Sequence, residues 1–177
     1  MLQSTVYTHP RTPWSFDRRK PVMTTHFSEK AVDYFLRGYN CAQATAVPFA
    51  ESCGLEVDTV LTMTAGFGGG IGGLRETCGA VSAMAFVAGL HIGPYAPDDI
   101  VVKKRLYDVV KQMVLAFTRE HGTICCRELL EQASCQVSPD PSVRTPEYYA
   151  TRPCAHIVAG AADIISRTLI DISAESP

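Results

Sequence analysis

The chain of 177 residues has an apolar fraction of 46%, a charged fraction of 19% and a formal net charge of −2. These values are typical of one globular domain with a hydrophobic core, and they exclude a disordered chain. Because no run approaches roughly 18 consecutive apolar residues and no basic face is apparent, we expect neither a membrane nor a nucleic-acid partner.

Seven cysteines are the most informative feature of the composition. The polar segment 1–22 lacks the apolar region of a secretory signal, so we expect a cytoplasmic protein. In a reducing compartment, an odd number of cysteines favours metal or redox chemistry over a disulfide framework.

Residues 1–22 contain three prolines and the only tryptophan, and they predict an irregular arm. Met23 is an equally suitable start, in which case residues 1–22 are a translated extension. We expect residues 23–177 to form one helical redox domain.

The first half of this domain predicts short helices. A helix capped by Ser28 and ended by Gly38 carries an apolar face, with Val32, Phe35, Leu36 and Tyr39. A second helix runs from Asn40 toward Cys53, is kinked by Pro48 and is followed by a short apolar segment, 57–64. The run 66–73 is too rich in glycine for a regular element, and a buried helix follows from 77 to about 91.

The second half predicts the longest helix, capped by Asp98 or Asp99 and ended by Gly122. Its core residues recur at helical spacing: Val102, Leu106, Val109, Val110, Met113 and Phe117. A short helix at 124–132, a polar loop and a final helix from about 152 to 170 complete the chain. Without strand or repeat signals, the prediction is an all-α, irregular single-domain bundle of about six to seven helices with a glycine-rich loop.

Cysteines occupy the first turn of four predicted helices. Their caps are Asn40 (with Gln43 completing a box), Thr77, Thr123 and Thr151, and the cysteines are Cys41, Cys78, either Cys125 or Cys126, and Cys154. The free N–H groups and positive dipole of a helix start favour thiolate over thiol, so four such ends can share one anionic centre. Cys53 lies at a predicted helix end and Cys135 in a loop, and neither is a candidate ligand.

The glycine run matches the dinucleotide fingerprint through Gly68, Gly70 and Gly73, but no strand precedes it, so a nucleotide site is not expected. One interpretation is a backbone loop that approaches a cofactor, with amides of Gly68, Gly69, Gly70, Gly72 and Gly73 facing cluster sulfurs. Tight helix–helix packing is the alternative.

Four segments in this order resemble the C_GCAxxG_C_C family of redox-active proteins: Gly38–Ala44, Gly66–Ala80, Cys126–Leu130 and Arg152–Cys154. The resemblance covers about 27–170 and implies a small helical redox protein with Cys41, Cys78, Cys126 and Cys154 as its four defining cysteines. A similar module occurs in split-Soret cytochromes, where an iron–sulfur site has been proposed. Two features depart from the pattern: Ala83 replaces a glycine, and there is no Cys-x-x-Cys-His for covalent haem.

Three functions are compatible with these cysteines. The first is electron transfer or redox sensing through an iron–sulfur cluster, expected to be [2Fe–2S] in type, that exchanges electrons with a partner protein. The second is thiol–disulfide chemistry with Cys78 as the nucleophile and no cofactor, and the third is a structural zinc site. A homodimer is compatible with each of these, and no histidine is assigned a catalytic role.

Overall fold

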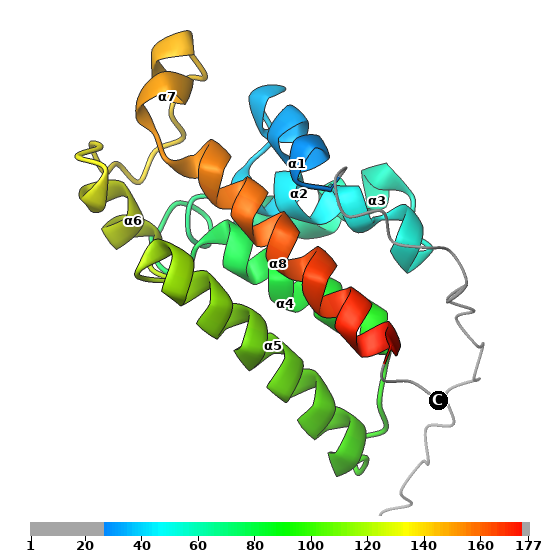
Figure 1. Ribbon diagram of the computed structural model, residues 1–177. Coiled ribbons are helices and arrows are strands. Elements are labelled where there is room, and N and C mark those ends of the chain that lie inside the picture. The colour runs from blue at the N-terminus through cyan, green and yellow to red at the C-terminus, as the bar shows by residue number, and fades with distance from the viewer. Residues whose placement is uncertain (1–26, 175–177) are drawn as a thin grey trace, which may run out of the picture.

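The computed structural model describes residues 27–174, so the arm expected at 1–22 lies outside the described residues. Eight α-helices form the described part of the chain, with three short 3₁₀ turns between them (Figure 1). The helices are α1 (Phe27–Leu36), α2 (Cys41–Ala46), α3 (Val57–Thr64), α4 (Gly79–Ile92), α5 (Ile100–His121), α6 (Cys126–Gln132), α7 (Pro146–Thr151) and α8 (Cys154–Ala174). The 3₁₀ turns are η2 (Val47–Phe49), η3 (Glu51–Cys53) and η4 (Ala65–Phe67).

The all-α prediction is therefore confirmed, and the described residues hold eight helices where six to seven were expected. The core forms where α8 crosses α4, with α5 packed along both and α1 and α2 covering the other side (Figure 1). Helix α4 is rich in small residues, and half of its residues are buried. Small side chains allow the backbones of neighbouring helices to approach closely, which suits a helix at the centre of the bundle. No helix in the described residues is both long and apolar enough to cross a membrane.

Local capping signals placed the starts of α2 and α5 correctly, whereas Ser28 and Thr151, expected as caps, are the second residue of α1 and the last residue of α7. Asn40 forms the predicted capping box at α2, accepting from the amides of Ala42 and Gln43 at 3.0 Å each while the Gln43 side chain accepts from the Asn40 amide. Asp99 caps α5 through the Val102 amide, at 3.0 Å. Three glycines end helical segments with positive φ, as predicted: Gly38, Gly54 and Gly122.

Three details differ from the expectation. Helix α2 changes into 3₁₀ turns at Val47, because Pro48 has no N–H to continue the α-helical ladder. Helix α7, capped by Thr145 with Pro146 in its first turn, lies in what was expected to be a loop. Leu36, assigned to the core face of α1, is 51% exposed, whereas Phe35 beside it is buried.

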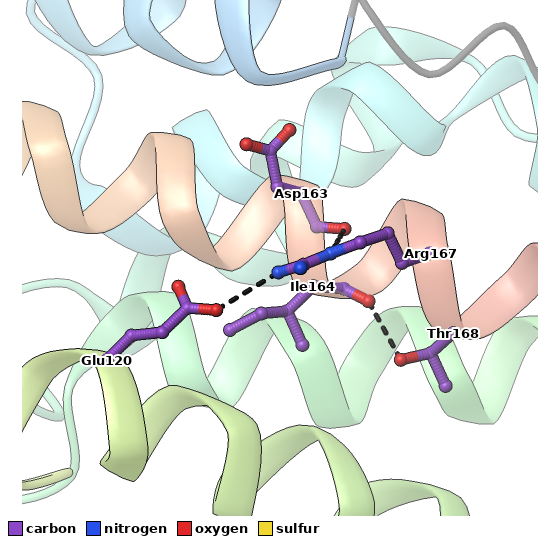
Figure 2. Close-up of polar contacts among 5 residues, drawn as sticks. All are labelled: Glu120, Asp163, Ile164, Arg167 and Thr168. Carbon is purple, nitrogen blue, oxygen red and sulfur yellow. Dashed lines mark hydrogen bonds and ion pairs between the residues drawn. The ribbon is translucent and has the colours of Figure 1, made fainter.

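Polar contacts join the two longest helices at the surface (Figure 2). Arg167 reaches from α8 to Glu120 near the end of α5, with an Nη2–Oε1 distance of 3.0 Å. Thr168 bonds back to the carbonyl of Ile164 at 2.8 Å, which satisfies its hydroxyl inside the helix. Because the ion pair is exposed, it contributes at most about 1 kcal/mol, and apolar burial between α5 and α8 carries the packing.

Candidate redox centre

Four helix starts carry cysteines at the same end of the bundle. Cys41, Cys126 and Cys154 are the first residues of α2, α6 and α8, and Cys78 immediately precedes α4. The starts of α4 and α8 lie at the end of the bundle where α6 packs (Figure 1). Sequence capping assigned Thr77 and Thr123 as caps of α4 and α6, whereas Cys78 and Cys125 occupy the cap positions.

Two chain segments are paired across this end and set the spacing of two of the cysteines. Thr77 and Cys125 form an isolated antiparallel bridge. The Cys78 amide donates to the Ile124 carbonyl at 2.8 Å, and the Cys126 amide donates to the Glu76 carbonyl at 2.7 Å. These bonds hold Cys78 and Cys126 side by side. The two residues are 48 positions apart in the chain, a separation that does not by itself indicate a contact.

The four cysteines interact as one group centred on Cys41. Thiols of Cys154 and Cys78 hydrogen-bond to Cys41 and hold its pKa well below the ordinary value, against the opposing effect of burial. The same hydrogen bonds to Cys41, followed by burial, raise the pKa of Cys78 and of Cys154. These interactions favour the charged form of Cys41 and the neutral forms of Cys78 and Cys154, because a thiolate accepts hydrogen bonds that a protonated thiol donates.

Cys126 completes the group. Burial is the main cause that raises its pKa, and the charge of Cys41 adds to the rise. Arg75 acts in the opposite direction, through a hydrogen bond and its positive charge. The charge of Cys126 in turn contributes to the raised pKa values of Cys78 and Cys154. The structure therefore brings together the four cysteines that the sequence selected, three of them buried and Cys154 half-buried.

Only part of the glycine loop contacts the group of four cysteines. Positive φ values run from 57° to 89° over five consecutive residues: Gly69, Gly70, Ile71, Gly72 and Gly73. The Gly69 amide hydrogen-bonds to the sulfur of Cys41 and lowers its pKa. Ile71 is β-branched and exposed, and a left-handed backbone at such a residue costs energy that the rest of the loop must offset.

The other predicted glycines have different neighbours. A β-carbon on Gly68 would lie 2.6 Å from the Asn40 side chain, and one on Gly73 would lie 2.4 Å from the Pro139 carbonyl oxygen. A β-carbon on Gly72 would meet nothing within 4 Å. Gly69 thus faces a sulfur, while Gly68 and Gly73 allow the loop to approach Asn40 and Pro139, neither of which lies within a helix.

Three arginines lie near the centre, and sequence reasoning assigned a role at the site to none of them. Arg75 is buried and donates from Nε to the Ser138 carbonyl at 2.8 Å, next to Cys126. Arg152 lies two residues before Cys154 and lowers its pKa by its charge. Arg144 has the same effect on Cys41. Positive charge near thiolates stabilises the charged form, so these side chains favour an anionic centre.

The remaining cysteines have separate surroundings. Burial raises the pKa of Cys53, at the end of η3, to about 11. The Cys135 thiol donates to the Thr151 carbonyl at 3.4 Å. Cys125 donates to the Arg75 carbonyl at 3.5 Å, and its charge contributes to the raised pKa of Cys126.

An all-α domain with a cluster of buried cysteines at one end is the class of protein that this fold and site define. The model of a family described as "Putative redox-active protein (C_GCAxxG_C_C)" matches residues 39–168, and the chain belongs to this family. The match covers well over half of the chain and includes all four cysteines of the centre. Comparisons with curated proteins and with solved structures gave no significant match.

Proposed function

We propose that the protein transfers electrons or senses redox state through an iron–sulfur cluster, [2Fe–2S] in type, held by Cys41, Cys78, Cys126 and Cys154. The observation that carries this proposal is the interaction of four thiols from four separate helix starts in one buried group. Four cysteine thiolates complete the ligand set of such a cluster, and sulfur is the donor that iron–sulfur clusters require.

The chain's own groups suit the charge of that cofactor, which supplies one-electron exchange when bound. Amides of Gly69 and Ala80 hydrogen-bond to the sulfurs of Cys41 and Cys78. Hydrogen bonds to ligand sulfurs stabilise negative charge and tune the potential. Burial of the cysteines excludes water from the centre.

The thiol form requires a rearrangement before it binds metal. In residues 27–174 no group of three or more His, Cys, Asp or Glu side chains is placed so that it could hold a metal ion. Cys41 interacts with both Cys78 and Cys154, so binding of a cluster would turn these three side chains toward a common centre. No observation favours the zinc alternative, in which four ligands surround a single ion.

Thiol–disulfide chemistry is a second candidate, favoured by the lowered pKa of Cys41 between two thiols. In that reaction two thiols form a disulfide and release two protons and two electrons, which an oxidised partner disulfide accepts. The sequence suggested Cys78 as the nucleophile, but the lowered pKa of Cys41 and the raised pKa of Cys78 favour Cys41 as the attacking thiolate. For either chemistry we propose a cytoplasmic redox partner protein, and a homodimer as a further arrangement.

Anaerobic purification or reconstitution distinguishes the two chemistries. We expect broad visible absorption with iron and acid-labile sulfide in matching amounts, and no such absorption in Cys41→Ser. Cys53→Ser is the matched control, because Cys53 lies at the end of η3, and it should load like the wild type. A colourless, metal-free protein that forms a disulfide involving Cys41 would contradict the cluster proposal and support thiol–disulfide chemistry. Stoichiometric zinc in the purified protein would contradict both proposals.

A further inference from the structure

The Arg144 side chain is enclosed by aromatic rings beside the centre. Its guanidinium carbon lies 4.9 Å from the ring centre of Phe35 and 4.5 Å from that of Tyr148. Its Nη2 atom donates to the Tyr39 carbonyl at 3.5 Å, two residues before Cys41. The loop that carries Arg144 is thereby attached to the chain segment that leads into α2.

The charge of Arg144 has no carboxylate partner among residues 27–174. Its Nη1 atom is buried and makes no hydrogen bond to any described residue. A buried charged group without a partner is costly, and stacking on aromatic rings offsets only part of that cost. The unsatisfied donor and the uncompensated charge therefore point to a negatively charged neighbour.

The cysteine group is that neighbour. The Arg144 side chain is hydrogen-bonded to the Tyr39 carbonyl, two residues before Cys41, and its positive charge acts on Cys41. Tyr148, on whose ring Arg144 stacks, is next to the same group, because the charges of Cys154 and Cys41 both act on its hydroxyl. Arg144, Cys41 and Cys154 therefore all lie near the Tyr148 side chain.

We propose that Arg144 is a counter-ion of the cysteine centre, beside Arg75 and Arg152, and raises its reduction potential, an inference that rests on the proposed redox function. The reduced centre is the more negative form in either chemistry, since a cluster gains one electron and a disulfide becomes thiolate and thiol. A nearby fixed positive charge stabilises the more negative form. Removing that charge therefore makes reduction less favourable.

The test compares midpoint potentials of wild type, Arg144→Gln, Arg144→Met and Arg144→Lys. Arg144→Met keeps apolar contact with the rings and removes the charge, while Arg144→Lys keeps the charge. Arg105→Gln is the control, because Arg105 is an exposed arginine in the first turns of α5, at the opposite end of that helix from α6. Potentials are measured in the reconstituted protein by spectroelectrochemistry and in the metal-free protein by equilibration with oxidised and reduced dithiothreitol.

In both neutral variants we expect the equilibrium constant for reduction to fall by about tenfold. This corresponds to a fall in midpoint potential of 59 mV for a one-electron cluster and 29.6 mV for a two-electron disulfide. Arg144→Lys and Arg105→Gln should stay near wild type. If the wild type loads no cluster, the proposed cofactor fails, and the metal-free arm still tests Arg144. Unchanged potentials in the neutral variants would contradict the proposed role of Arg144. An equally large fall in potential in Arg144→Lys would contradict it as well.

Discussion

Gly70 lies directly against Cys126: a β-carbon built on Gly70 would be 2.7 Å from the β-carbon of Cys126 and 2.8 Å from the Glu76 nitrogen. The contact joins the glycine loop to the first residue of α6. It leaves no room for a side chain at Gly70, whose φ of 67° also disfavours one. The same contact therefore packs the glycine loop and positions Cys126.

Gly70→Ala should destabilise the protein more than Gly72→Ala. Both residues have positive φ, which costs about 1–2 kcal/mol for alanine. Only Gly70 adds a steric clash, because the space around Gly72 is open, and overpacking costs about 1–3 kcal/mol more. Urea denaturation of the metal-free proteins measures the difference, and equal losses would show that the contact with Cys126 carries no energy.

Replacing Asn40 should separate its two roles. Asn40→Ala removes the acceptor of the α2 capping box and the Nδ2 bond to the Ala65 carbonyl, and should cost about 1–2 kcal/mol of unfolding free energy. Asn40→Asp keeps the acceptor and loses only the bond to Ala65, so its loss should be smaller. Chemical denaturation distinguishes them, and an equal loss in both variants would assign the effect to the Ala65 bond.

Cys41 should react with a small alkylating agent at lower pH than Cys53 in the folded, metal-free protein. The pKa of Cys41 is lowered by its hydrogen bonds from Cys154 and Cys78, while burial raises that of Cys53 to about 11. The thiolate fraction at pH 8 is therefore larger at Cys41. Mass spectrometry of peptides after timed labelling gives the order, and since Cys41 is the more buried of the two, accessibility alone predicts the reverse.

His121 should make the protein less stable as the pH falls below 6.5. Burial is the main cause that lowers its pKa, and the charge of His156 adds to the effect. The unfolded chain then binds a proton that the folded protein does not, so unfolding free energy is lost as the pH falls from the ordinary histidine pKa of 6.5 to the lower pKa of the folded protein. Denaturation at pH 7.5 and pH 5.5 should show a smaller loss in His121→Leu, and an unchanged loss would exclude His121 as the source.

Helix starts were predicted from the sequence because capping depends on residues within one turn. Asn40 and Gln43 specify the start of α2 through their own side chains, whatever the rest of the chain does. The same short-range signals placed a cysteine in the first turn of three other helices, and Cys78, Cys126 and Cys154 lie within one residue of the observed starts. Thr145 and Pro146 carried an equally local signal for α7, which the polar composition of that segment obscured.

The interactions of the centre were decided by tertiary packing alone. Arg144 reaches the Tyr39 carbonyl across 105 positions in the chain, a contact that no local pattern indicates. The low pKa of Cys41 depends on which thiols donate to it, and these come from α8 and from the residue before α4. The sequence by itself determined where the cysteines lie on their helices. Only the folded structure decided that the pKa of Cys41 is the one that is lowered, because burial and neighbouring charges are properties of the assembled core.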